Sequence, residues 1–311
     1  MAWRTLLVQA GGRFRVKNHQ LLCSNEDGDF TVALEEIAVV VVDTAAAQLN
    51  SYLLTALPKA GAAVVFCDKQ HLPCGMLLPF HQHSRQTAMA AEQIGWSKPF
   101  RKRAWQAIVR QKVRNQAACL GALDIAGADS LAQMAGMVTS GDTGNVEARA
   151  SQYYWKQLFG AAFRRTGHRS AYSSRVNGAL NYGYAVVRAA VARAIASHGL
   201  LPCFGLHHDS QLNAFNLADD LIEPLRPNVD YIVARLSAGW NPKDPDDLQS
   251  EDRRALAGLG GAAIPIQGEI HSLIHAAEVT VESLSRAGRA KDAAQLVLPA
   301  LGAVAGNGGS A

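Results

Sequence analysis

Over the first ~70 residues, short apolar runs alternate with polar turn residues. The runs cover 6–8, 14–17, 21–23, 30–32, 37–42 and 63–66, and Gly11-Gly12 and Asn25 to Gly28 separate some of them. Short runs of this kind, bounded by glycine and acidic residues, are typical of strands. Thr44 is placed to cap one inserted helix reaching Leu57, which Pro58 ends. The pattern predicts a small β-sandwich-like domain.

From about residue 85 the apolar positions recur with helical periodicity. They predict helices near 83–94, 98–122, 129–138, 145–165, 179–197, 217–240, 250–258, 267–287 and 290–300. The Ala/Val-rich segment 179–197 is apolar all round, which indicates burial in the middle of its domain. We therefore expect an α+β protein with four parts: a β-rich domain over 1–72, a linker over 73–84, a larger all-α catalytic domain over 85–301 and a disordered tail over 302–311.

Composition narrows the class of protein. Hydrophobic residues make up 49% of the 311 residues, which excludes global disorder. Five cysteines without a C-x-x-C pair signal neither a disulfide framework nor a zinc ribbon. The N-terminus lacks a signal-peptide pattern, and the longest aliphatic run, Ile37 to Val42, is too short to cross a bilayer. We expect a reduced, cytoplasmic protein.

Charge is distributed unevenly along the chain. Residues 93–208 carry 15 Lys and Arg against four Asp and Glu, whereas the whole chain has a net charge of only +4. Residues 148–208 contain no acid and eight basic residues: Arg149, Lys156, Arg164, Arg165, Arg169, Arg175, Arg188 and Arg193. A one-signed bias of this length favours a polyanionic partner over an ordinary solvated face.

The predicted helix 98–122 carries a second basic stretch. Seven basic residues fall within 17 positions without an acid: Lys98, Arg101, Lys102, Arg103, Arg110, Lys112 and Arg114. Arg110 and Arg114 are four residues apart and share a helix face. We expect DNA phosphate contacts from Arg101, Arg103, Arg110, Arg114, Arg149, Arg164 and Arg165.

Two remote segments carry the candidate chemistry. Asn145 can cap a helix with Glu147 in its first turn, where the helix dipole favours a carboxylate. His207-His208 lies in a predicted loop. Carboxylate and imidazole ligands suit Mg²⁺ or Mn²⁺, and such a metal on a basic surface suits a phosphodiester. The plainer interpretation is that Glu147 only complements the helix dipole and that the histidines are ordinary surface or core residues.

The next predicted helix opens at Asn216 and is rich in acid. Either Asp219 or Asp220 can share a helix face with Glu223, unless the segment is simply a solvated helix end. Pro224 shortens or kinks this helix. Arg226 can form an ion pair with one of the acids or contact a phosphate.

These motifs resemble those of the universal CRISPR-associated integrase, the catalytic subunit of the spacer-acquisition complex, in its type II form. The resemblance is carried by Trp3-Arg4-Thr5, by 145–150 running into Tyr154-Trp155 and Leu158-Phe159, by 177–184, and by 204–208 with 213–230. It covers nearly the whole chain. It implies an N-terminal β-domain, a helical catalytic domain and a homodimer, with a small partner subunit bridging two such dimers on double-stranded DNA.

The resemblance also implies an activity and its residues. The family inserts spacers into a CRISPR array by attack of a DNA 3′-hydroxyl on a phosphodiester, and hydrolyses DNA at the same metal-dependent site. Its Glu, His and acid ligands match Glu147, His208 and, in type II relatives, Glu223. Asp220 is the second choice or a supporting partner. The implied cofactor is Mg²⁺ or Mn²⁺.

Two other functions are compatible with parts of the sequence. A non-catalytic DNA-binding scaffold would share the basic surface and need no metal. A small-molecule metallohydrolase would share the ligands but would not need a wide positive field, so the acid-free span argues against it.

Overall fold

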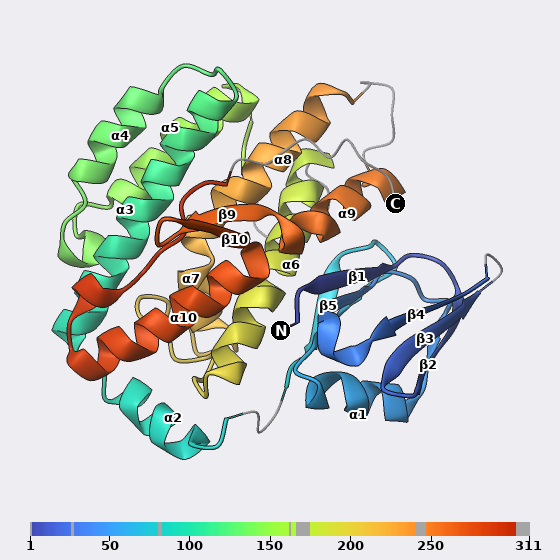
Figure 1. Cartoon of the computed structure of the whole chain (residues 1–311). Helices are drawn as coiled ribbons and strands as arrows, with labels where there is room; N and C mark the ends of the chain where they lie inside the picture. The colour runs from blue at the N-terminus through green and yellow to red at the C-terminus, as the bar shows by residue number, and fades with distance from the viewer. Residues whose placement is uncertain are drawn as a thin grey trace.

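The computed structural model describes residues 2–25, 28–79, 83–161, 163–165, 175–240 and 247–302, which form two four-stranded β-sheets, a two-stranded hairpin and a helical body (Figure 1). The first sheet has the order β1-β5-β7-β8, with β1 at Arg4–Val8, β5 at Ile37–Val42, β7 at Ala63–Cys67 and β8 at Pro73–Leu77. The second has the order β4-β3-β2-β6, with β2 at Gly12–Lys17, β3 at Gln20–Asn25, β4 at Gly28–Ala33 and β6 at Ala47–Leu49. The predicted β-rich start of an α+β protein is confirmed.

Strand β5 joins the two halves of the molecule. It pairs in parallel with both β1 and β7, and all six of its residues are buried. Val40 and Val42 pack into the core of the N-terminal domain, whereas Val39 and Val41 pack into the helical core. Since successive strand side chains point to opposite faces, an uninterrupted apolar run is what a strand covered on both sides requires.

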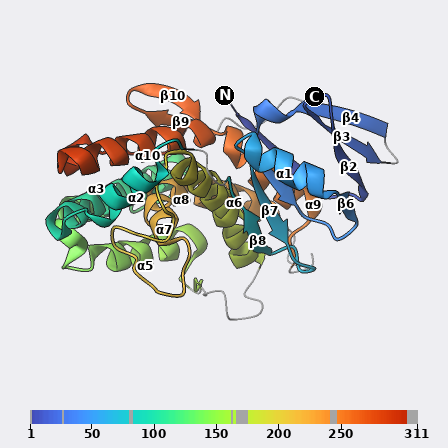
Figure 2. The same cartoon turned by 90° about the horizontal axis from the view of Figure 1, so that it is seen from below.

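Helices pack against both faces of the first sheet and form the rest of the molecule. Figure 2 shows α6 and α1 on either side of β7. The helices are α1 Ser51–Lys59, α2 Gln86–Ile94, α3 Lys98–Ala122, α4 Ala128–Gly136, α5 Val146–Phe159, α6 Arg175–Ser197, α7 Asn216–Leu221, α8 Arg226–Ala238, α9 Ser250–Ala257 and α10 Leu273–Ala290. Within the described ranges, no helix has the length and apolar character to cross a membrane.

The structure corrects several predicted boundaries. Residues 73–77, expected in a linker, form β8 and pair antiparallel with β7. The first helix begins at Ser51, where the Asn50 side chain accepts a hydrogen bond from the Leu53 amide, so Thr44 is not its cap. The tail beyond residue 302 lies outside the described residues.

The predicted all-α domain contains a hairpin, β9 Ala263–Ile266 with β10 Glu269–Ser272. Residues 296–300, expected to be helical, contain no helix, and side chains hold the segment 296–302 instead. Ser283 Oγ accepts from the Val297 amide, Asn115 Oδ1 from the Leu301 amide, and Asn228 Oδ1 from the Gly302 amide. Local periodicity did not reveal these distant polar partners.

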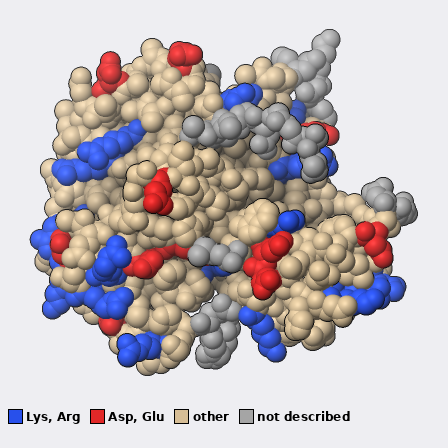
Figure 3. Space-filling view, in the orientation of Figure 1, with Lys and Arg blue, Asp and Glu red and all other residues tan. Residues whose placement is uncertain are grey.

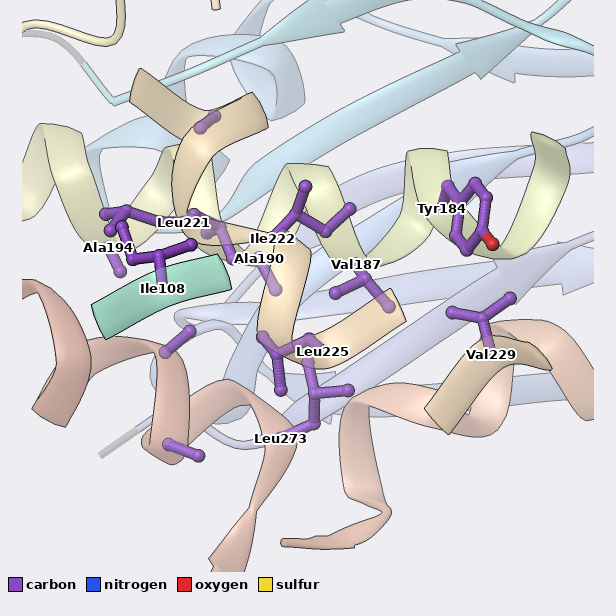
Figure 4. Close-up of a cluster of buried hydrophobic side chains, with 14 of the residues drawn as sticks. Ile108, Tyr184, Val187, Ala190, Ala194, Leu221, Ile222, Leu225, Val229 and Leu273 are labelled. Atoms are coloured by element: carbon purple, nitrogen blue, oxygen red, sulfur yellow. The ribbon is translucent and has the colours of Figure 1, made fainter. Parts of the chain in front are cut away.

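Helix α6 is the centre of the helical core, as its apolar circumference predicted. Tyr184, Val187, Ala190 and Ala194 project from it toward residues of α3, α7, α8 and α10, and Figure 4 shows them interleaved with Ile108, Leu221, Leu225, Val229 and Leu273. Leu180, Ala189 and Ile195 are completely inaccessible to solvent. This core fixes the relative positions of the helices that carry the candidate chemistry.

Gly183 allows α6 and α8 to approach closely. A Cβ atom at this position would collide with Cγ1 of Val229 and lie 3.2 Å from Cδ2 of Leu256. Because valine is stiff at χ1, the collision cannot be relieved by a simple rotation. We predict that Gly183→Ala lowers the free energy of unfolding by about 1–3 kcal/mol, measured by urea denaturation.

Gly178→Ala on the same helix is the matched control. A Cβ there meets Leu248 Cγ at 3.8 Å, an ordinary contact, so the variant should be as stable as the parent or more stable, by up to ~1 kcal/mol, from helix propensity. Equal stability of the two variants would contradict the close-packing argument.

Candidate active site

Lys112 on α3 brings together two carboxylates that are 76 residues apart in the chain. Its ammonium forms an ion pair with Glu147 Oε1 of α5 and lies 2.6 Å from Glu223 Oε2 of the 3₁₀ turn η3, Glu223–Leu225. The Lys112 and Glu223 side chains are 9% and 7% exposed, and that of Glu147 is 30% exposed. Glu147 and Glu223, both predicted as site residues, therefore lie on either side of one buried cation.

Asp142 positions Glu147 at the start of α5. Its two carboxylate oxygens accept hydrogen bonds from the amides of Val146, at 3.0 Å, and Glu147, at 2.9 Å. Asn145 occupies the residue before the helix but has a left-handed backbone, and its side chain makes no cap hydrogen bond. The predicted Asn145 cap is therefore wrong, and Asp142 satisfies the free amides of the first turn.

The sequence allowed either Asp219 or Asp220 to share a helix face with Glu223, but the helix break next to Pro224 separates them. Helix α7 ends at Leu221, η3 follows, and α8 starts at Arg226. Asp219 pairs with Arg188, 3.0 Å away, whereas Glu223 pairs with Lys112 and, at 3.0 Å, with Arg226. The break in the helix directs like charges to different partners, and Arg226 forms the ion pair offered as one of its two roles.

Asp220 builds the loop that carries His208. Its carboxylate is completely buried and accepts from the amides of Leu206, His207 and His208 at 2.5, 3.1 and 3.2 Å. His208 Nδ1 lies 2.7 Å from Asp220 Oδ1, an arrangement that fixes the ring orientation and leaves Nε2 for another partner. A Cβ at Gly205 would collide with the His208 carbonyl, so this tight loop requires glycine.

Neighbouring charges shift the pKa values of Glu223 and His208. Burial opposes the charged form of Glu223, but Arg226 and Lys112 outweigh it and hold the pKa of Glu223 below its usual range. The hydrogen bond to Asp220 raises the pKa of His208, with smaller contributions from the charges of Asp220 and Glu223. Glu223 and His208 are thus close enough to influence one another electrostatically.

The predicted metal ligands do not form a ready-made cage. Nowhere in the described part of the chain do three or more His, Cys, Asp or Glu side chains gather closely enough to hold a metal ion. The position between Glu147 and Glu223 belongs to the Lys112 ammonium. The carboxylates nevertheless share a cation, and His208 has one ring nitrogen already oriented by Asp220.

His207 has a separate structural role beside His208. Its ring stacks on buried Trp105 with centroids 4.3 Å apart and planes 2° from parallel, and His208 meets the same indole edge-on at 5.8 Å. Trp105 of α3 therefore packs against both histidine rings.

The expected DNA-contacting arginines divide into two groups. Those with exposed side-chain positions are Arg101, Arg103, Arg114, Arg149 and Arg164. Arg110 instead donates two hydrogen bonds to the Val138 carbonyl, at 3.2 and 2.8 Å, and Arg165 donates to Asn177 and Asn181, at 2.9 and 2.6 Å. Arg110 and Arg165 thus fasten helices and loops together.

The acid-free span overstates the exposed positive charge. Three of its basic residues pair with acids from later in the chain: Arg175 with Asp252 at 2.6 Å, Arg188 with Asp219 at 3.0 Å and Arg193 with Glu278 at 2.7 Å. Arg169 lies outside the described residues. On the face in Figure 3, Lys and Arg gather at the edge formed by α2, α3 and the end of α10, interleaved with acids.

Lys112 was predicted only as one of the seven basic residues of the stretch 98–114, and its position between two acids was not foreseen. The signal was present in the spacing, because Ile108, Val109, Val113 and Gln116 surround Lys112 on the buried face of α3. A cation at an apolar-face position requires a buried anion nearby. No spacing rule identified Glu147 and Glu223 as those anions.

Comparisons with known proteins agree with this fold over almost its full length. The family description "CRISPR associated protein Cas1" matches residues 6–255. The chain is 42% identical over 301 residues to the "CRISPR-associated endonuclease Cas1" of Neisseria meningitidis serogroup C, strain 8013, covering 96% of each protein. The chain belongs to the Cas1 family.

Solved structures share the Cas1 fold at lower identity. A chain described as "Casposase bound to integration product" superposes with a TM-score of 0.76 at 20% identity, covering 93% of this chain and 91% of that one. A chain of a "Cas6-RT-Cas1--Cas2 complex" superposes with a TM-score of 0.74 at 18% identity, covering 94% of this chain and 36% of that one. The resemblance inferred from the motifs is confirmed.

A second buried acid lies behind the site. Asp230 accepts hydrogen bonds from the hydroxyls of Tyr154, at 3.2 Å, and Tyr184, and Arg226 lies over the Tyr184 ring, 4.6 Å from its centroid. Burial raises the pKa of Asp230 to about 7, although both tyrosine hydrogen bonds oppose the shift. Arg226 also pairs with Glu223, so it lies between Glu223 and the tyrosine that donates to Asp230.

We predict a pH-dependent contribution of Asp230 to stability. Its pKa is higher in the folded protein than in the unfolded chain, so its favourable contribution is complete below about pH 4 and is lost as the pH rises toward 7. The unfolding free energy of the parent minus that of Asp230→Asn should fall by about 1.4 kcal/mol per pH unit between pH 5 and 6.5. Denaturant titrations at several pH values measure this difference, and a constant difference would contradict the raised pKa.

Proposed function

We propose that the protein is a metal-dependent DNA integrase and endonuclease of CRISPR adaptation. The observation that carries the proposal is the meeting of Glu147 and Glu223 at one buried cation position, near an imidazole oriented by Asp220. The name of the Neisseria relative and the integration product in the casposase structure support the same chemistry.

The donor set fits Mg²⁺ or Mn²⁺. Glu147 and Glu223 offer carboxylate oxygens at a position that already favours positive charge, and His208 offers Nε2 while Asp220 holds Nδ1. Asp220 directs both oxygens to the loop 206–208, so we assign the third ligand to Glu223 and a supporting role to Asp220. A divalent cation held there would stabilise negative charge on a reacting phosphate.

The proposed reaction exchanges one phosphodiester for another. The 3′-hydroxyl oxygen of the incoming DNA end forms a bond to phosphorus, the bond to the 3′-oxygen of the repeat strand breaks, and the proton passes from the attacking to the departing oxygen through solvent. With water in place of the hydroxyl, the same exchange is hydrolysis. The rigid placement of Glu147 and His208 on a helix start and a braced loop positions these groups for either nucleophile.

The proposed partners follow from the family and the surface. We propose that the protein acts as a homodimer, that a small partner subunit bridges two such dimers, and that the assembly binds double-stranded protospacer and repeat DNA. The Cas1–Cas2 neighbour supports the partner subunit. The exposed basic residues of α3 support the DNA contact.

We predict that Glu147→Gln and His208→Ala each abolish strand transfer and cleavage in Mn²⁺ while the folded structure persists. Each change removes one proposed ligand from a position that is partly exposed, so the core stays packed. Gel assays with a labelled repeat duplex measure both reactions, and circular dichroism checks the fold.

Glu282→Gln, at an exposed glutamate of α10, is the matched control and should retain activity. Full strand transfer by Glu147→Gln would refute the assigned site. Metal-independent DNA binding by the parent, with neither cleavage nor joining, would instead favour the non-catalytic scaffold.

We predict that Arg114→Ala weakens DNA binding and lowers the slope of log affinity against log salt concentration by about one. Arg114 is exposed and has no hydrogen-bond or ion-pair partner among the described residues, so its charge is available to a phosphate. Arg110→Ala should act mainly on stability, since its guanidinium serves the Val138 carbonyl. Fluorescence anisotropy at several salt concentrations measures the slope, and an unchanged slope for Arg114→Ala would show that α3 faces away from DNA.

A further inference from the structure

The ammonium of Lys112 holds the position that a shared cation would take. It contacts one oxygen of Glu147 and one of Glu223, and its side chain is only 9% exposed. Neither carboxylate is paired with the other directly. Without the lysine, two acids would face one another in a largely buried site, an arrangement that costs stability.

The backbone around Lys112 is fixed relative to Glu223. Three residues further along α3, Asn115 donates to the carbonyl of Pro224 at 2.7 Å and to that of Pro299 at 2.9 Å. Asn115 is 2% exposed. These hydrogen bonds hold α3 against η3, so the ammonium can leave the carboxylates by rotation of the long lysine side chain without a shift of the helix.

The charges of the site determine whether a divalent metal ion can bind while the Lys112 ammonium is still in place. Glu147 and Glu223 carry two negative charges, and Lys112 and Arg226 already supply two positive ones. A divalent ion added to this set would leave two uncompensated positive charges in a mostly buried site. Removal of the ammonium reduces that excess and vacates the oxygens that a metal would need.

Resting on the proposed metal-dependent function, we propose that Lys112 is a positioning residue whose ammonium substitutes for the divalent ion between Glu147 and Glu223 and leaves when that ion binds. Metal loading is then an exchange of cations. In the metal-free protein, the lysine holds both carboxylates at one centre, and once displaced it leaves their oxygens to the divalent ion.

Two substitutions that should change the Mn²⁺ affinity in opposite directions test the exchange. Lys112→Met keeps the length of the chain and removes the competing charge, so it should bind Mn²⁺ about tenfold or more tightly than the parent, the scale of one close charge pair. Lys112→Arg keeps the charge and can contact a carboxylate through two N–H groups, so it should bind Mn²⁺ more weakly. Electron paramagnetic resonance of free Mn²⁺ measures both affinities without DNA or turnover.

Thermal unfolding gives a second readout. Without metal, Lys112→Met should have a lower melting temperature than the parent, and Mn²⁺ should raise it by more than it raises that of the parent. Glu147→Gln added to Lys112→Met should recover part of the lost stability, since it removes one of the two facing charges. Lys102→Met, an exposed lysine on the same helix, is the control and should change neither the Mn²⁺ affinity nor the Mn²⁺-induced shift.

The outcomes separate the two proposals. Equal Mn²⁺ affinities for the parent, Lys112→Met and Lys112→Arg, or weaker binding by Lys112→Met, would overturn the exchange and leave the metal site standing. If neither the parent nor Lys112→Met binds Mn²⁺, the proposed metal site fails and the exchange fails with it. If Lys112→Met does not fold, an unchanged Mn²⁺ affinity of Lys112→Arg still overturns the exchange.

Discussion

Every charge buried in the helical core needs a partner of opposite sign, and the centre of this protein is arranged to meet that need. Lys112 satisfies Glu147 and Glu223, Arg226 satisfies the other oxygen of Glu223, and Asp220 is satisfied by three backbone amides and His208. An unpaired member would cost several kcal/mol, a large share of the stability of an ordinary domain. The geometry of the candidate site is therefore part of what holds the core together.

The same requirement joins the N-terminal domain to the helices. Asp43, at the end of β5, pairs with Arg253 of α9 at 2.6 Å, and Arg193 of α6 donates to the carbonyl of Gly61 at 2.6 Å while pairing with Glu278 of α10. These contacts lie beside the apolar face that β5 presents to the helical core. The two regions thus share buried contacts, and residues 73–77 contribute a strand to the first sheet.

Hydrogen bonds from neighbouring elements hold the residues of the candidate site in place. Asp142 holds the start of α5, and Asn115 holds η3 against α3. His208 lies on a loop whose curvature Gly205 permits and Asp220 maintains. The parts free to respond to a ligand are side chains on this frame, above all the long chain of Lys112.

Elements with strong local signals could be predicted from the order of residues alone. The alternating runs gave six strands of the first region, the helical periodicity gave α3 at its observed bounds, and the apolar circumference of 179–197 placed α6 in the core. The motifs around Glu147, His208 and Glu223 determined the family. Each of these predictions depends on residues that are close together in the sequence, or on a motif with fixed spacing.

The pairing of the charges, in contrast, depends on how the chain folds in space. It placed Lys112 between two acids 35 and 111 residues away, and it turned Asp219, Asp220 and Glu223 toward three different partners at the break before Pro224. It also neutralised Arg175, Arg188 and Arg193 with acids from later in the chain, which a count of charges along the sequence could not foresee. The strength of a Coulomb interaction depends on the distance between the two charges in space and on how deeply they are buried. Neither the distance nor the burial can be read from the spacing of residues along the chain.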